Sequence, residues 1–144
     1  MPTRAAFMAA LIGASMLSIG VARAETVMFQ AKLTGGAEVP ATPSKGTGTL
    51  MATLDTTTKT LSWTVTYSGL TGPAIGGHFH GPAPAGKNAG VAIPFKGPLA
   101  SPIKGSTTVT DAQIKELEAG DMYVNLHTAA HTGGEIRGQV EKGM

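Results

Sequence analysis

The chain has 144 residues, with 11 Lys and Arg against 9 Asp and Glu, and it contains no cysteine. This length suits one domain with a single core, and the lack of cysteine excludes disulfides and lipid attachment through an N-terminal cysteine. The small net charge, without a basic stripe or a basic amphipathic helix, argues against nucleic acid and a membrane surface as partners.

The first 24 residues have the pattern of a secretory signal peptide. The basic residue Arg4 precedes an apolar run over Ala5–Val21, which ends in the small-x-small exit Ala22-Arg23-Ala24. The core of the run is short for a membrane-spanning helix, which needs about 20 residues, although an uncleaved anchor is the alternative. We therefore expect a signal peptide over residues 1–24, a working domain over residues 25–144, and a periplasmic or secreted location.

Apolar and polar residues alternate strictly along much of the mature chain, and this pattern predicts β-strands with one buried face. The clearest run places Leu61, Trp63, Val65 and Tyr67 on one face. Residues 27–33 and 50–54 alternate in the same way, and the polar turn over Thr56–Lys59 predicts a hairpin. Further short strands are expected at Ile75–His80, Gly90–Phe95, Ile103–Thr110, Met122–His127 and Glu135–Val140.

One helix is expected between two of these strands. Thr110-Asp111-Ala112-Gln113 is typical of a capping box, Ile114 and Leu117 supply an apolar stripe, and Gly120 is a natural stop. Many short strands separated by Pro and Gly predict an all-β fold. We expect an antiparallel, Greek-key-like β-sandwich or barrel, with the short helix as a lid over one end of the core.

All four histidines fall in two short clusters. His78 and His80 lie in GGHFHGP, and His127 and His131 lie in NLHTAAHTGG. Residues two apart on a strand share a face, so His78 and His80 should lie together while the residue between them enters the core. The preceding Gly76-Gly77 pair is expected to leave room around the two rings.

If the two strand ends are neighbours, the imidazoles can converge on one metal ion. Nitrogen ligands suit copper, zinc or nickel, and the Irving–Williams order favours Cu(II), with zinc as the alternative. The predicted metal ligands are His78, His80, His127 and His131. Asn125 shares the face of His127 and could orient an imidazole. The other interpretation is that the histidines serve only as hydrogen-bonding groups.

Three further charged residues could act near this site. Glu135 and Arg137 are two apart on a predicted strand, so both could face the same way. Arg137 could steer an anion or pin the loop of His127, or the two could form an ion pair or a clamp on backbone carbonyls. Glu38 is expected to be a buried or loop-bonding carboxylate. No recognisable nucleophile motif is present, so no catalytic residue is predicted.

Four segments resemble the CHRD domain, which is named from its occurrence in chordin and is common in exported bacterial proteins. They are Leu33–Pro40, His78–Ala83, Met122–Thr128 and Gly134–Gln139, in this order. The pattern Y-V-N-x-H-T followed by G-E-I-R-G-Q is the most diagnostic part. The resemblance implies a β-sandwich in an extracytoplasmic setting, with His78, His80 and His127 inside the family motif, but it implies no single activity.

The layout is also similar to a reduced copper–zinc superoxide dismutase, with an H-x-H pair and a later histidine near a G-x-x-R turn. The disulfide and the His/Asp-rich zinc loop of that enzyme have no counterpart here, and similarity of fold does not carry function. The favoured function is an exported copper-binding protein for sequestration, delivery or resistance. The alternatives are a non-catalytic module for an unidentified protein partner and a copper-dependent dismutase.

Overall fold

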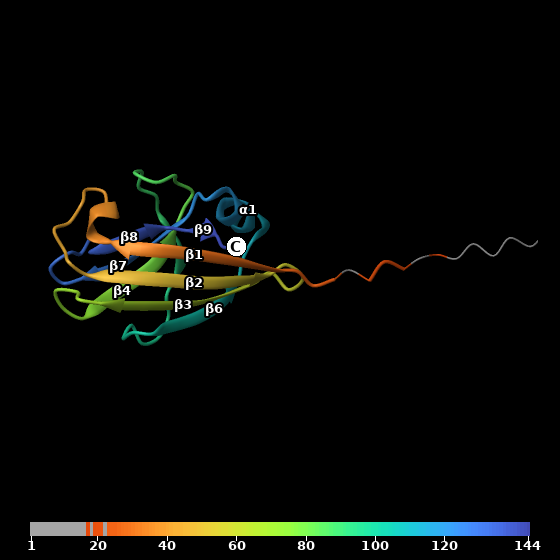
Figure 1. The fold of residues 1–144 in the computed structure, drawn as a ribbon, viewed down its shortest axis with the longest axis horizontal. Coiled ribbons are helices and arrows are strands. Elements are labelled where there is room, and N and C mark those ends of the chain that lie inside the picture. The colour runs from red at the N-terminus through yellow and green to blue at the C-terminus, as the bar shows by residue number, and fades with distance from the viewer. Residues whose placement is uncertain (1–16, 18, 22) are drawn as a thin grey trace, which may run out of the picture.

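A computed structural model describes Leu17, residues 19–21 and residues 23–144, and shows a curled β-sheet with one α-helix (Figure 1). The predicted signal peptide falls on residues 1–24, most of which lie outside the described residues. Within the part of the chain that the structure describes, no helix is long and apolar enough to cross a membrane.

The all-β fold with one short helix is confirmed, and every predicted strand has a counterpart. The 3-10 helix η1 and the strand β9 have only three and two residues, too few to produce a periodic pattern. The elements in chain order are β1 (Thr26–Thr34), η1 (Gly35–Ala37), β2 (Thr47–Asp55), β3 (Thr60–Ser68), β4 (Ala74–His80), β5 (Val91–Pro94), β6 (Ile103–Thr108), α1 (Asp111–Ala119), β7 (Tyr123–Thr128), β8 (Ile136–Gln139) and β9 (Glu141–Lys142).

The strand order is β5-β4-β7-β8-β1-β2-β3-β6, with β9 paired to β1, and all pairs are antiparallel. β8 and β1 share a single register pair, Thr34 with Arg137. The sheet therefore divides into two halves, β5-β4-β7-β8 and β1-β2-β3-β6. The connections from β3 to β4, from β5 to β6 and from β6 to β7 pass between them. The halves cover a common core, which gives the sandwich-like form.

The core lies between the two halves and follows from the alternation of side chains. Leu61, Trp63 and Val65 of β3 enter it from one half, and Phe79 of β4 enters from the other. Trp63, Phe79 and Phe95 form an aromatic cluster with ring centroids 5.4–5.6 Å apart. Because Phe79 enters the core, its neighbours His78 and His80 are directed to the opposite face of β4.

The helix α1 begins and ends as its sequence predicts. The Thr110 side chain accepts a hydrogen bond from the Gln113 backbone N–H, and the Gln113 side chain accepts one from the Thr110 N–H. Gly120 ends the helix in the left-handed region, at φ 76°. Leu117 is fully buried and joins the main core, so the helix covers one end of it.

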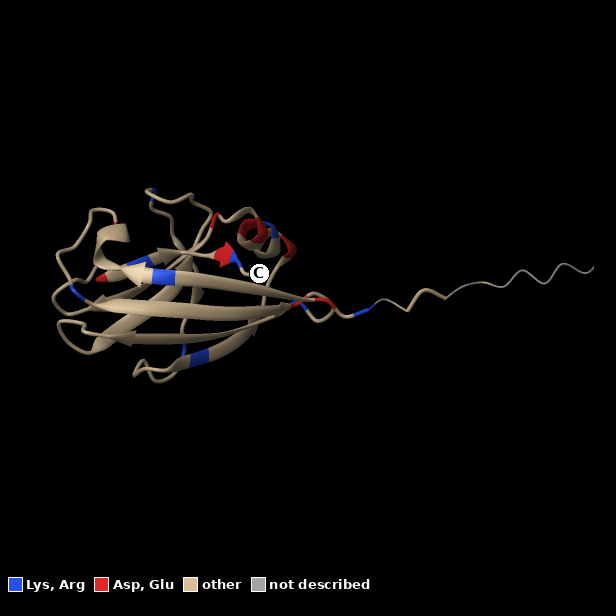
Figure 2. Ribbon diagram, in the orientation of Figure 1, with Lys and Arg blue, Asp and Glu red and all other residues tan. Residues whose placement is uncertain are grey.

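Charged side chains are sparse on this domain. Figure 2 shows Lys and Arg dispersed over separate strands and loops, and acidic residues on α1. Among the described residues the one salt bridge joins Lys59 to Asp111 at 2.7 Å, with both side chains exposed. Such a surface pair contributes little, so the fold depends on burial and hydrogen bonding.

Candidate metal centre

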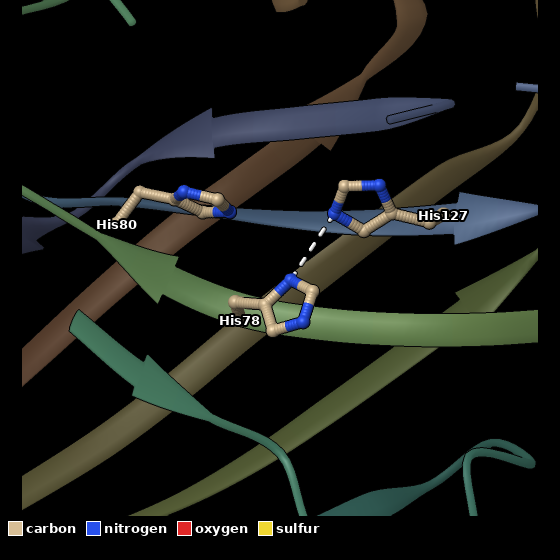
Figure 3. A group of neighbouring side chains, drawn as sticks. All are labelled: His78, His80 and His127. Carbon is tan, nitrogen blue, oxygen red and sulfur yellow. Dashed lines mark hydrogen bonds between the residues drawn. The ribbon is translucent and has the colours of Figure 1, made fainter. Parts of the chain in front are cut away.

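Three imidazoles come together on the outer face of β4 and β7 (Figure 3). His78 and His80 lie on β4, and antiparallel pairing sets His78 opposite Asn125 of β7. His127 follows two residues later on the same face of β7. One ring nitrogen from each of the three histidines lies within 4.8 Å of the others. Strand register therefore brings His127 beside two histidines that precede it by 47 and 49 residues in the sequence.

The closest pair of rings already has the spacing of two ligands. His78 Nδ1 and His127 Nε2 are 3.2 Å apart and form a hydrogen bond (Figure 3). Two nitrogens that bind one ion at about 2.0–2.1 Å are themselves about 3–4 Å apart. The widest separation, up to 4.8 Å, requires the rings to close by on the order of 1 Å around an ion. The group has the composition of an imidazole metal site and nearly its dimensions.

Backbone carbonyls determine the orientation of two of the rings. His80 Nδ1 donates to the Ala89 carbonyl oxygen at 3.0 Å, and His127 Nδ1 donates to the Thr132 carbonyl oxygen at 2.9 Å. Because a carbonyl only accepts, the neutral form of each ring carries its lone pair on Nε2. Histidines that bind metals usually donate their second ring nitrogen in this way.

The side chain of Asn125 lies between these two Nε2 atoms. Its Oδ1 is 2.9 Å from Nε2 of both His80 and His127. In the neutral rings neither Nε2 can donate, so two lone pairs and an amide oxygen face one another. The conflict is relieved if the amide turns its Nδ2 toward the rings, or if a cation joins the nitrogens. Asn125 is therefore placed to respond to a cation at this group.

Burial favours the uncharged forms of two of the histidines. Loss of solvent lowers the pKa of His78, and repulsion from His127 and His80 acts in the same direction. Loss of solvent also lowers the pKa of His80 and outweighs its hydrogen bonds to Ala89 and Asn125. An ordinary histidine has a pKa of about 6.5, so both rings stay neutral to a lower pH than that. The neutral form is the one that binds a metal ion.

The buried ring of His80 stacks on Tyr123. The two rings are nearly parallel, at 3°, with centroids 4.7 Å apart. The guanidinium carbon of Arg137 lies 3.4 Å from the centre of the Tyr123 ring, and the Arg137 side chain is only 1% exposed. The ring of Tyr123 therefore lies between the buried positive charge of Arg137 and the ring of His80.

Arg137 holds the loop over residues 81–90 against this stack. It donates to the carbonyl oxygen of Lys87 and to Oδ1 of Asn88, the latter at 2.8 Å. The Tyr123 hydroxyl donates to the Ala89 carbonyl oxygen at 3.1 Å. Of the roles considered for Arg137, the geometry is that of a clamp on a carbonyl. The loop that it holds follows His80, whereas the prediction considered the loop of His127.

Glu135 lies away from the histidines, although it is two residues from Arg137. Its carboxylate is completely buried and accepts hydrogen bonds from Ser44, Thr71 and Thr128. The ion pair considered for Glu135 and Arg137 is absent, since the salt bridge found among the described residues is elsewhere. Glu135 precedes β8 and joins three other segments of the chain.

His131 lies outside the group that could hold one ion. Reciprocal backbone hydrogen bonds join it to Thr128 in a turn, at 3.1 and 3.3 Å. His131 lines a separate pocket together with Glu38 and Gly134. The predicted convergence therefore holds for three histidines and does not include His131, which lies in the turn after β7.

The two glycines before His78 have different surroundings. A Cβ at Gly76 would lie 3.5 Å from the His78 ring, an ordinary contact. A Cβ at Gly77 would come within 2.5 Å of the Phe95 ring and 2.9 Å of Leu126. The expectation that both glycines leave room for the imidazoles is wrong for Gly77, which faces the core.

We predict that Gly77→Ala destabilises the domain by about 1–3 kcal/mol, the usual cost of an extra carbon in a filled core. The matched variant Gly76→Ala should unfold at a denaturant concentration close to that of the wild type. Urea denaturation of the two variants tests this difference. Equal midpoints would show that the core around Phe95 is not tightly filled.

Three supporting groups are not identified by the sequence patterns: the Tyr123 ring and the carbonyl groups of Ala89 and Thr132. Tyr123 shares a strand face with Asn125 and His127, so the alternation of β7 does contain a signal for it. A backbone carbonyl leaves no signal in the residue type, and only the path of the loop determines its position.

The all-β, sandwich-like fold and the three converging imidazoles together define a β-domain with a candidate metal centre. The sequence matches the family model for the CHRD domain over residues 29–140, which is more than half of the chain. The protein belongs to the CHRD domain family, as its motifs predict, and this membership supports an extracytoplasmic module. Searches of curated proteins and of solved structures returned no match.

Proposed function

We propose that this protein is an exported copper-binding protein that takes up the ion for sequestration, delivery or resistance. His78, His80 and His127 are the proposed ligands. The observation that supports this most is the orientation of His80 and His127. Their Nδ1 atoms donate to carbonyl groups, so their Nε2 lone pairs are directed toward a common space beside the His78 ring.

The chemistry of the donors favours copper among the common ions. Imidazole nitrogens suit copper, zinc and nickel, whereas calcium and magnesium prefer oxygen ligands. Cu(II) forms the strongest complexes of the divalent series, and zinc is the alternative. Arg137 repels a cation near His80, as its effect in lowering the His80 pKa indicates. The affinity would therefore come from nitrogen–metal bonds rather than from a negatively charged surrounding.

Removing one ligand should weaken copper binding strongly. We expect His78→Ala and His127→Ala each to lower the Cu(II) affinity by about 100-fold or more, because even partners behind the ligands typically contribute 10–100-fold. The matched control His131→Ala should bind Cu(II) as the wild type does. Competition titrations against a coloured chelator measure all four proteins.

Two outcomes of these titrations would overturn the proposal. The first is wild-type affinity in both His78→Ala and His127→Ala, and the second is a loss in His131→Ala as large as theirs. Negligible binding of Cu(II) and Zn(II) by the wild type would favour a non-catalytic interaction module. Circular dichroism of each variant shows whether the fold is retained.

The affinity should also fall in acid, because protons compete with the metal for the imidazoles. Since burial lowers the pKa values of His78 and His80, these two rings should contribute to the loss only below the ordinary histidine range. Titrations at a series of pH values locate the loss. A loss centred above about pH 6.5 would contradict the assignment of these buried rings as ligands.

A further inference from the structure

A cavity lies where the sheet ends, away from the histidines. β5 and β6 are the two ends of the strand order and are not paired with each other. A cavity of about 210 Å³ lies between them and the first turn of α1. Its lining residues are Trp63, Ala92, Ile93, Pro94, Lys96, Gly105, Ser106, Thr107, Thr108 and Gln113.

The indole N–H of Trp63 lacks a partner at this cavity. Trp63 is 6% exposed, and its Nε1 has no hydrogen-bond acceptor among the described residues. Leaving such a buried donor unpaired costs about 1–3 kcal/mol. A molecule that brings an acceptor into the cavity would recover this free energy on binding.

Gly105 allows the indole to reach the cavity. It lies opposite Trp63 in the pairing of β3 with β6. A Cβ at Gly105 would come within 2.5 Å of the indole ring and 2.9 Å of Nε1. Because Gly105 has no side chain, the N–H edge of the indole lies over β6, and both residues line the cavity. The donor is thus at the cavity wall rather than inside the core.

The walls combine apolar surface, the neutral polar residues of β6 and α1, and one positive charge. Ile93 and the Trp63 ring are buried, and Trp63 is stacked on Phe95 with centroids 5.6 Å apart. Lys96 is exposed and lines the cavity, and no Asp or Glu is among the lining residues. Lys96 also takes no part in the salt bridge found among the described residues. An apolar body and an anionic acceptor complement these walls.

The volume limits the size of this ligand. A dry cavity of about 150 Å³ accepts benzene, so about 210 Å³ can take one aromatic ring with a short side chain. We propose that the cavity binds a small aromatic monocarboxylate, with its ring against Ile93 and Trp63 and its carboxylate near the indole N–H and Lys96. This site is independent of the proposed metal centre.

The protein contains a single tryptophan, so its fluorescence reports on the cavity. We expect phenylacetate, titrated with a metal chelator present, to change this emission in a saturable way. The uncharged analogue phenylacetamide should bind several-fold more weakly. Lys96→Gln should lower the phenylacetate affinity several-fold, whereas Lys104→Gln, an exposed lysine of β6 outside the cavity lining, should leave it unchanged.

Trp63→Phe removes the indole N–H but keeps an aromatic ring, and its binding is measured by calorimetry because the fluorescence is lost. We expect about a tenfold or greater loss of affinity, the effect of losing a hydrogen bond to a charged group. Lys96→Gln carries the test if Trp63→Phe does not fold. A non-saturable response of the wild type, or equal affinities in Lys96→Gln and Lys104→Gln, would overturn the proposal.

Discussion

Replacing Glu135 with glutamine should destabilise the domain by about 1–3 kcal/mol, because the donors at one oxygen of this buried carboxylate would face an amide NH₂ in place of an acceptor. Oε2 accepts from Ser44 Oγ at 2.9 Å and from the Thr71 backbone N–H at 3.0 Å. Oε1 accepts from Thr128 Oγ1 at 2.8 Å and from the Thr71 hydroxyl. Whichever oxygen the amide replaces, the donors there lose this acceptor. The Ser44, Thr71 and Thr128 hydroxyls can turn to accept from the NH₂, whereas the Thr71 backbone N–H cannot.

The loss should appear as a lower midpoint of urea unfolding with an unchanged slope. Glu118→Gln, on the exposed face of α1, is the matched control and should unfold like the wild type. Glu135→Gln with a wild-type midpoint would show that Glu135 does not join these segments in solution.

The charge of Glu135 also affects stability in acid. Burial alone would raise its pKa, but the hydrogen bonds from Thr71, Thr128 and Ser44 outweigh this effect and lower it below the ordinary value of 4.5. A lowered pKa means that the folded state binds fewer protons than the unfolded chain. The stabilisation that the charged Glu135 carboxylate gives the fold is therefore complete above pH 4.5. It is lost as the pH falls through the folded-state pKa.

Glu38 should produce the opposite dependence on pH. It is 6% exposed, and its Oε1 has no hydrogen-bond partner within the part of the chain that the structure describes. Burial raises its pKa from 4.5 to about 7, although Asn125 and Arg137 act against the shift. The folded state therefore binds a proton that the unfolded chain has lost, and the stability that depends on Glu38 falls as the pH rises from 4.5 to 7.

The loss of stability due to Glu38 is about 3 kcal/mol, because each unit of its pKa shift from 4.5 to about 7 corresponds to about 1.4 kcal/mol. Glu38→Gln has no such proton to lose, so its stability relative to the wild type should improve by this amount between pH 4.5 and pH 8. Urea unfolding of both proteins at a series of pH values measures the difference. Parallel curves for the two proteins would show that Glu38 titrates normally.

Much of the fold can be predicted from local patterns, because alternation determines which face of a strand is buried. The run Leu61–Tyr67 predicts β3, and the capping box at Thr110 predicts the start of α1. Alternation does not show which strands are neighbours. The path of the whole chain determines that β8 and β1 share a single register pair. It also determines that the edge strands β5 and β6 stay unpaired with each other.

The same limit applies to the histidines. Spacing places His78 and His80 on one face, and it places His127 on the face of Asn125. The pairing of β4 with β7 brings these faces together, and no local pattern contains that information. His131 follows a turn whose geometry is set by backbone hydrogen bonds with Thr128, so its direction cannot be obtained from the spacing of four residues.

The proposed copper site depends on nitrogen ligation by three particular rings. Pulsed electron paramagnetic resonance of the protein loaded with one equivalent of Cu(II) detects the imidazole nitrogens bound to the ion. We expect the signals of three imidazoles in the wild type and in His131→Ala, and of two in His78→Ala. Spectra without bound imidazole, or a full set of signals in His78→Ala, would contradict a copper centre formed by His78, His80 and His127.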